Sequence, residues 1–136
     1  MSVQIECRYE GELHCSAVHG PSGSTLSTDA PADNQGRAEA FSPTDLVATA
    51  VGSCMLTIMG IYARPRSIRI EGARAVVEKE MTKSPPRRIA RLNVRISLPA
   101  TLTEKARGAL ERAARGCPVC ASLRPDVEVA LTFEYV

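Results

Sequence analysis

The chain has 136 residues, of which 44% are hydrophobic and 24% charged, and its formal net charge at pH 7 is +2. This length and composition suit an aliphatic core, so we expect residues 1–136 to form one domain and exclude a multidomain enzyme. The near-neutral charge and the few aromatic residues argue against nucleic acid or acidic membranes as partners. The first residues lack the basic and apolar segments of a secretory signal, so we expect a cytoplasmic protein.

The beginning of the chain is predicted to form short strands. Residues 3–9 alternate between apolar and polar side chains, which is typical of a half-buried strand. Residues 10–11 predict a turn, and the apolar face continues over residues 13–17 on a second strand. After a Gly-Pro-Ser-Gly break, residues 24–28 predict a third strand. Residues 29–41 are aperiodic and rich in turn-forming residues, so we expect a loop that carries a function.

A long apolar helix is predicted next. Ser42, Pro43 and Asp45 form a helix-start signature, with a hydroxyl N-cap, a proline at the first helical position and a carboxylate in the first turn. Residues 46–63 carry no formal charge, which approaches the shortest length that spans a bilayer. Glycines and hydroxyl residues dilute this hydrophobicity, and strands flank it on both sides. We therefore expect a helix buried on nearly all faces by a sheet, and no membrane segment.

The rest of the chain continues the mixed pattern. Residues 69–81 and 89–98 are predicted strands, and the second alternates strictly between apolar and polar side chains. Thr103 is expected to cap a second helix that ends at Gly116. Residues 127–135 predict a closing strand. Strands and helices in this order, joined mainly by hairpin-like connections, favour an α+β fold with a largely antiparallel sheet.

The cysteines are the main candidates for functional residues in this composition. The cysteines are Cys7, Cys15, Cys54, Cys117 and Cys120. In the cytoplasm they should stay reduced unless they take part in transient redox chemistry, and an odd number cannot pair completely within one chain. Cys7 and Cys15 lie on the apolar faces of their predicted strands, so we expect both to act as small hydrophobic residues.

The three later cysteines leave several interpretations open. Cys54 lies in the middle of the apolar helix, where a buried thiol is usually inert. Cys117 precedes a proline at a predicted helix start, which favours the thiolate, so local sequence makes it the most easily ionised thiol. Cys117 and Cys120 form a CxxC pair, as in a thioredoxin-like couple or half of a zinc site. A second ligand pair for zinc is missing, so we do not expect a metal, and this CxxC follows a helix rather than a strand, which argues against a thioredoxin-like couple. No glycine-rich loop of a nucleotide-binding type occurs, so we expect no cofactor.

Two segments of the sequence carry a combined pattern: Phe-Ser-Pro-Thr-Asp-Leu at residues 41–46, running into Gly-Ser-Cys-Met at 52–55, and Cys-Pro-Val at 117–119, with Ser-Leu at 122–123. With these segments the chain resembles the OsmC/Ohr family, the osmotically inducible protein C and organic hydroperoxide resistance proteins. The likeness covers nearly the whole chain and includes the Asp-Ala-Pro loop at residues 29–31. It implies an OsmC-like α+β fold in which the sheet packs on a long buried central helix. It also implies an intertwined homodimer with active sites at the subunit interface.

The resemblance further implies a thiol-dependent peroxidase that reduces organic hydroperoxides in oxidative stress defence and needs no metal or haem. Carried onto this sequence, Cys54 is the peroxidatic thiol and Cys117 the resolving thiol. The first thiolate attacks the O–O bond and becomes a sulfenic acid, which condenses with the second thiol to a disulfide that an external dithiol reduces. Cys54 lies about 16 Å along the helix from Pro43, too far for the helix dipole to ionise it, so a separate cation must do so.

The sequence also departs from the family. Thr44 stands where hydroperoxide reductases carry a glutamate directly after the helix-starting proline. The family's active-site arginine comes from the N-terminal region, where Arg8 and Arg37 are the candidates. Cys120 is an additional thiol that could compete as the resolver, pair with Cys117, or act as a small packed residue. The alternative function is a binding protein of the same fold for lipophilic small molecules, without peroxidase activity.

Overall fold

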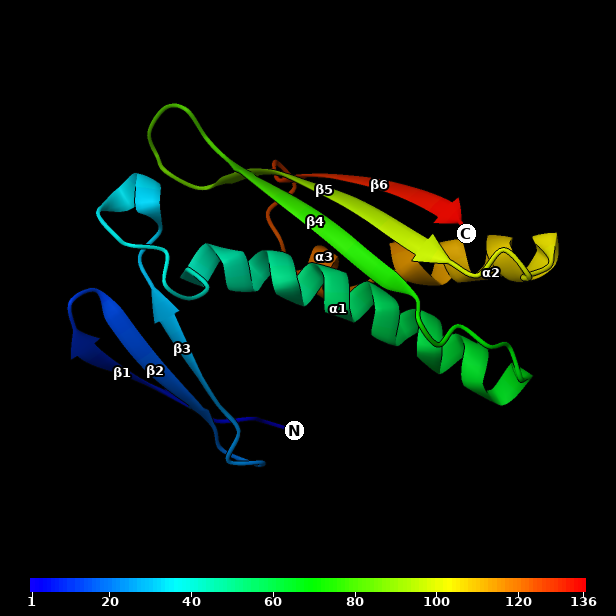
Figure 1. The fold of residues 1–136 in the computed structure, drawn as a ribbon, viewed down its shortest axis with the longest axis horizontal. Helices are drawn as coiled ribbons and strands as arrows, with labels where there is room; N and C mark the ends of the chain where they lie inside the picture. Colours follow the sequence, from blue (N-terminus) through cyan, green and yellow to red (C-terminus); the bar gives the residue numbers. More distant parts are fainter. The chain divides into compact units, whose positions relative to one another are not determined.

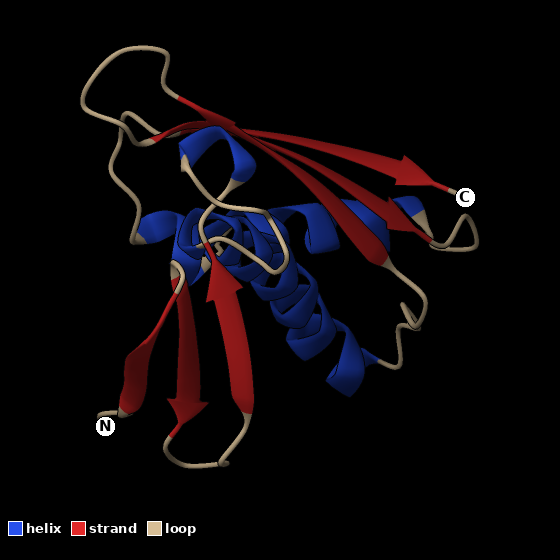
Figure 2. Cartoon of the chain, turned by 60° about the vertical axis from the view of Figure 1, so that its left-hand side comes forward, coloured by secondary structure: helices blue, strands red, loops and turns tan.

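The computed structural model describes all 136 residues, which divide into two compact units, Met1–Leu46 and Val47–Val136. Each unit contains one three-stranded sheet, and α-helices gather in the second (Figures 1 and 2). The predicted α+β class is therefore confirmed. The strands were expected in a single sheet and instead form two, because the first three strands pair only with one another.

The N-terminal unit is an antiparallel meander. Its strands are β1 (Ile5–Gly11), β2 (His14–His19) and β3 (Thr25–Asp29), followed by the 3-10 turn η1 (Ala32–Asn34). The first turn lies at Glu12 and Leu13, both with positive φ, rather than at the predicted residues 10–11. Gly11, with φ of +93°, shifts the register of β1 against β2 and so extends the strand past the expected turn.

The predicted half-burial of the first strand is wrong in the single chain. Every β1 residue except Gly11 is exposed, and the Cys7 thiol is exposed with them, whereas Cys15 is half-buried. The reason is that the N-terminal unit contains only η1 and the first turn of the long helix, which are too short to cover a sheet. Its exposed apolar side chains include Val3, Ile5, Tyr9, Leu13, Val18, Leu26 and Phe41.

The long helix α1 (Pro43–Ala63) begins where the sequence predicts. The Ser42 Oγ accepts a hydrogen bond from the Asp45 amide at 3.1 Å, and the Asp45 Oδ2 accepts one from the Ser42 amide at 2.9 Å. These reciprocal bonds satisfy backbone donors that the first helical turn leaves unpaired. Ser42, Pro43 and Asp45 therefore perform the roles that their sequence pattern predicts.

Only one side of α1 is buried, so the expectation of a helix covered on nearly all faces is wrong. The buried side chains form a stripe: Ala48, Val51, Gly52, Met55, Met59 and Ala63. Ile61 is 65% exposed, because the neighbouring three-stranded sheet lies along one side of the helix (Figure 1). A Cβ on Gly52 would lie 3.0 Å from the Val77 Cγ2, so the glycine permits this close approach.

Segment Pro43–Arg66 is the one helix long and apolar enough to cross a membrane by length and composition. The core helix of a soluble protein meets the same criterion. Here the buried stripe of α1 belongs to the same hydrophobic cluster as the strands of the second sheet. This packing buries 33% of the most apolar 18-residue stretch of the segment, which accounts for one side of the helix.

The C-terminal sheet pairs its strands in two ways. It consists of β4 (Arg74–Met81), β5 (Ile89–Leu98) and β6 (Glu128–Tyr135). Strands β4 and β5 are antiparallel, whereas β5 and β6 are parallel and joined through α2 (Glu104–Arg115) and α3 (Pro118–Ala121). This crossover was not predicted, because hairpin-like connections were expected to dominate over crossovers. The other strand pairs are antiparallel, so the prediction of a largely antiparallel arrangement is confirmed.

Local signals in the C-terminal unit predict its elements well. Strand β5 has the predicted bounds, and its apolar side chains are buried: Ile89, Leu92, Val94, Ile96 and Leu98. The Thr103 Oγ1 caps α2 by accepting from the Ala106 amide at 3.1 Å, and Gly116 ends that helix. Strand β4 begins at Arg74 rather than at residue 69, because a turn that includes Gly72, with φ of +89°, precedes it.

Candidate functional site

Two thiols far apart in the sequence meet inside the C-terminal unit. Cys54 lies midway along α1, and Cys117 is the N-cap residue of α3. The Cys117 thiol is close enough to Cys54 to raise the pKa of its thiol; Cys117 belongs to the hydrophobic core cluster, and Cys54 packs against that cluster. Cys117 is 1% exposed, whereas Cys54 is half-buried. A small molecule that approaches this pair would therefore reach Cys54 first.

The surroundings of Cys54 oppose its ionisation. Burial raises the pKa of the Cys54 thiol above its ordinary value, and the neighbouring Cys117 thiol raises it further. The backbone N–H of Val119, in the first turn of α3, donates to the Cys54 sulfur and acts in the opposite direction. Because burial is the largest of these effects, Cys54 needs a nearby positive charge to become a thiolate near neutral pH. The sequence pattern gave no indication of the Val119 contact, which depends on tertiary packing.

Cys120 belongs to the same cluster. It lies within α3, three residues after Cys117, and its half-buried side chain packs, as that of Cys54 does, against the core that contains Cys117. Three of the five cysteines therefore gather in the C-terminal unit. Of the other two, Cys15 is half-buried as a small strand residue. Cys7 is exposed, although it was expected to act as a small hydrophobic residue on an apolar strand face.

The residues singled out at the start of α1 and in the N-terminal unit have local partners. The Thr44 hydroxyl lies 3.3 Å from the Ser42 Oγ, and the Asp45 carboxylate takes part in the helix cap. Arg8 forms an ion pair with Glu6 at 3.0 Å. Arg37 lies 3.7 Å from the Glu39 carboxylate. Both arginines belong to the N-terminal unit, and both are exposed.

A buried carboxylate in the N-terminal unit was missed by the sequence analysis. Asp29, at the end of β3, is 1% exposed, and its Oδ2 accepts a hydrogen bond from the Glu39 amide at 2.9 Å. The His14 Nε2 lies 3.1 Å from the Asp29 Oδ1. The Glu39 hydrogen bond is the main cause that lowers the pKa of Asp29. An Asp before Ala-Pro at a strand end was the available signal, and the ties to Glu39 anchor the loop that follows.

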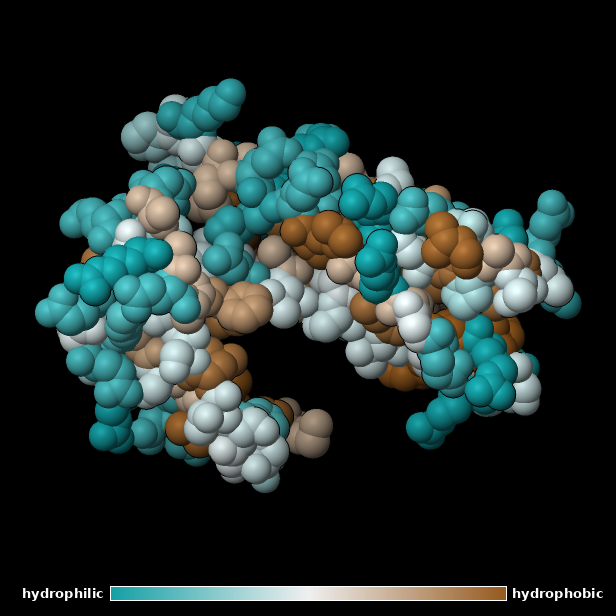
Figure 3. Space-filling view, viewed as in Figure 1, coloured by the Kyte–Doolittle hydropathy of each residue, from teal (hydrophilic) through white to brown (hydrophobic).

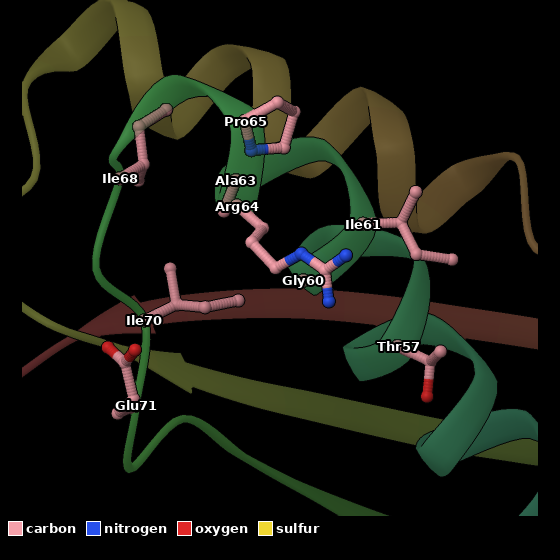
Figure 4. A pocket seen from close by; sticks show the side chains of 9 residues that line it. All are labelled: Thr57, Gly60, Ile61, Ala63, Arg64, Pro65, Ile68, Ile70 and Glu71. Atoms are coloured by element: carbon pink, nitrogen blue, oxygen red, sulfur yellow. The ribbon is translucent and has the colours of Figure 1, made fainter.

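A pocket of about 850 Å³ lies beside the C-terminal end of α1 (Figure 4). Its lining is mostly apolar, with Ile61 on the helix and Ile68 and Ile70 on the segment that leads to β4. Arg64 and Glu71 add one charge of each sign. Hydrophobic side chains reach the surface at this end of the helix (Figure 3). The pocket is therefore suited to an apolar ligand or an apolar side chain.

No group of three or more His, Cys, Asp or Glu side chains is arranged to hold a metal ion. The CxxC pair brings two thiols together, and the third nearby thiol belongs to Cys54. The arrangement can thus support thiol and disulfide chemistry directly, since a sulfenic acid on one cysteine would form next to a second thiol.

The chain is similar in sequence and in structure to known proteins. Residues 35–132 match the family model described as OsmC-like protein. A solved structure from Psychrobacter arcticus 273-4, a putative osmotic stress induced and detoxification response protein, is 42% identical to this chain. The match covers 96% of this chain and 94% of that one, with a TM-score of 0.90. A search of the curated proteins finds no match.

More distant structures share the fold. An organic hydroperoxide resistance protein OsmC from Legionella pneumophila, also described as a predicted redox protein, is 19% identical, with a TM-score of 0.75 over 100% of this chain and 98% of that one. The organic hydroperoxide resistance protein OhrB of Bacillus subtilis is 15% identical, with a TM-score of 0.71 over 98% of each chain. The family match covers most of the chain and includes both Cys54 and Cys117, in agreement with the resemblance of the two motifs. The chain therefore belongs to the OsmC-like protein family.

Proposed function

We propose that this protein is a thiol-dependent peroxidase that reduces organic hydroperoxides in oxidative stress defence. Cys54 attacks the distal peroxide oxygen, the alcohol leaves, and Cys54 becomes a sulfenic acid. The Cys117 thiol then attacks the Cys54 sulfur, so that water leaves and a Cys54–Cys117 disulfide forms. An external dithiol reduces this disulfide and is itself oxidised. The observation that supports the proposal is that Cys54 and Cys117 meet at one hydrophobic cluster, where the Cys117 thiol is close enough to raise the pKa of Cys54.

The burial of the two thiols bears on the substrate. Cys54 is the more exposed thiol of the pair, which suits the first step, and the buried Cys117 suits the second, in which no outside molecule is needed. The hydrophobic cluster at which both thiols lie includes Val51, Met55 and Leu110, and the Val119 amide contacts Cys54. Such surroundings favour alkyl or fatty hydroperoxides over the strongly hydrated hydrogen peroxide.

The proposal also requires a cation for Cys54, because burial holds the pKa of this thiol above its ordinary value. We assign the role to Arg37 or Arg8, and methionine variants of both decide between them. The variant that lacks the arginine acting on Cys54 should show a pH dependence of peroxide reduction that is moved to higher pH, since removal of a nearby positive charge raises a thiol pKa. The other arginine serves as the matched control and should leave the pH profile unchanged.

We further propose that the functional form is an intertwined homodimer in the cytoplasm, with residues 1–136 acting as one domain. The exposed apolar side chains of the N-terminal unit support this, because large apolar side chains that nothing in the single chain covers are candidates for burial on association. In a dimer these side chains would be covered. Sedimentation of the purified protein tests the assembly, and a monomer at micromolar concentration would contradict it.

The central experiment follows the mass of the intact chain after one equivalent of cumene hydroperoxide. Formation of the disulfide removes two hydrogen atoms, so a loss of about two mass units per chain is expected. Cys54→Ser should abolish peroxide turnover while the protein stays folded. Cys117→Ser should stop after a single turnover and leave a sulfenic acid on Cys54 that dimedone traps. Full activity of Cys54→Ser would refute its role.

A second candidate is a binding protein for lipophilic small molecules, which the apolar pocket beside Ile61, Ile68 and Ile70 favours. Thr44, which stands in the position of the glutamate of hydroperoxide reductases, agrees with it. In this case hydroperoxide would leave the mass of the chain unchanged, or would oxidise the thiols only to irreversible acids. A fluorescent fatty acid would bind the protein and lose affinity on Ile61→Asp, whereas Val76→Asp, at an exposed valine outside this pocket, is the control.

A further inference from the structure

A third thiol lies close in the chain to the resolving thiol. Cys120 and Cys117 are three residues apart; Cys117 belongs to the hydrophobic core cluster, and Cys54 and Cys120 both pack against it. The proposed reaction assigns no task to Cys120. Because Cys120 lies next to the resolving thiol in the chain, it is a candidate for a later step of the reaction.

The local backbone allows Cys117 and Cys120 to bond to each other. Cys117 is the N-cap of α3, and its carbonyl accepts a hydrogen bond from the Ala121 amide at 3.1 Å, which closes one helical turn over the CxxC segment. Side chains three residues apart on such a turn have Cβ atoms about 5–6 Å apart. Disulfides need Cβ atoms about 3.5–4.5 Å apart, so a modest local adjustment brings the two sulfurs together.

Cys117 is buried, whereas Cys54 and Cys120 are both half-buried, and this difference matters for reduction. Cys117 is 1% exposed, so an external dithiol cannot attack its sulfur directly. Attack on the Cys54 sulfur requires the reductant to enter the site that receives the hydroperoxide. Cys120 is half-buried and lies on the short helix α3, which gives a reductant a second point of access.

We propose that Cys120 takes over the disulfide from Cys54, an inference that rests on the proposed function. The Cys120 thiolate attacks the Cys117 sulfur of the Cys54–Cys117 disulfide. The Cys117–Cys120 bond forms, the Cys54–Cys117 bond breaks, and Cys54 leaves as a thiolate that takes up the proton lost by Cys120. No net oxidation or reduction occurs in this exchange, so it needs no further reactant.

The exchange separates the two halves of the catalytic cycle. Cys54 returns to the reduced state before any reductant arrives, and the external dithiol then reduces the Cys117–Cys120 disulfide by attack at the Cys120 sulfur. A cation that ionises Cys54 for the peroxide step also makes it a better leaving group in the exchange, because a thiol with a lower pKa leaves faster.

The test maps the disulfides over time in a chain carrying Cys7→Ser and Cys15→Ser, which removes the two thiols of the N-terminal unit. The protein receives one equivalent of cumene hydroperoxide, is quenched with acid and N-ethylmaleimide, and is digested with trypsin. A Cys54–Cys117 disulfide joins two peptides, whereas a Cys117–Cys120 disulfide lies within one peptide, because no Lys or Arg separates these cysteines. The joined peptides should appear first and then convert to the internal disulfide.

The Cys120→Ser variant in the same background supplies the comparison. The Cys54–Cys117 disulfide should form at an unchanged rate, which shows that the fold and the first steps are intact. It should then persist, and its reduction by dithiothreitol should be about tenfold slower because the reductant has lost its accessible sulfur.

The possible failures are distinct. If the Cys54–Cys117 disulfide forms with Cys120 present and never converts, the exchange is refuted and the proposed function stands. A Cys54–Cys120 disulfide as the first product would also refute the exchange, because Cys120 would then be the resolving thiol itself. If Cys54 forms neither a disulfide nor a sulfenic acid, the proposed function fails and the exchange fails with it.

Discussion

The two units of this protein are built on different physical principles. In the C-terminal unit, aliphatic side chains from α1, α2 and β5 form a buried core that holds the thiols in place. In the N-terminal unit, the buried residues are Asp29 and Ser42, both polar, whereas the apolar side chains are exposed. The C-terminal unit can thus fold around its own core. The N-terminal unit depends on hydrogen bonds, ion pairs and, in the proposed homodimer, association that covers its apolar side chains. The candidate chemistry lies in the unit that has the core.

The largest expected difference between the units is the effect of removing a leucine. Leu92 on β5 is 0% exposed, so Leu92→Ala should lower the free energy of unfolding by about 2–5 kcal/mol. Leu26 on β3 is 44% exposed in the single chain, so in a dissociated monomer Leu26→Ala should change it by no more than about 0.5 kcal/mol. Urea unfolding of both variants at two protein concentrations measures this. Because the proposed homodimer covers the N-terminal sheet, the loss from Leu26→Ala should be larger at the concentration at which the dimer forms, and a small loss at both concentrations would contradict that covering.

The helix caps provide a comparison of intermediate size. Ser42 is buried and takes part in a reciprocal cap, whereas Thr103 is exposed and makes a single bond to the Ala106 amide. We expect Ser42→Ala to cost about 1–2 kcal/mol of unfolding free energy and Thr103→Ala about 0.5–1 kcal/mol. Thr103→Ser keeps a capping hydroxyl and is the control. Equal losses from the two alanine variants would show that burial adds nothing to the Ser42 cap.

The smallest expected effect is the response of Asp29 to acid. Its pKa is lowered in the folded protein, chiefly by the Glu39 hydrogen bond, so its carboxylate adds stability above the pKa of the unfolded chain. That contribution is lost as the pH falls through the lowered pKa of the folded state. Asp29→Asn should therefore melt earlier than the unmodified protein at neutral pH and at nearly the same temperature in strong acid. A melting-temperature difference that does not depend on pH would contradict this account.

Several helix and strand boundaries could be predicted from sequence patterns only a few residues long. The start of α1 depends on Ser42 and Asp45, which lie within one helical turn, and the bounds of β5 follow from strict alternation. Other elements were placed wrongly for a physical reason. The alternation in β1 shows which side chains share a face, but burial depends on whether another layer covers that face. Likewise, the alternation within β5 and β6 predicts two strands but does not show that they pair with each other in parallel.

The sequence by itself determined the α+β class, the caps, the long apolar helix and, through its two motifs, the family. Only the tertiary structure decided that α3 lies against the middle of α1, so that Cys54 meets Cys117 and the Val119 amide. It also decided that Asp29 is buried and that Cys7 is exposed. The reason is that capping and periodicity act between residues within a turn or two. Contacts between distant residues depend on which surfaces pack together.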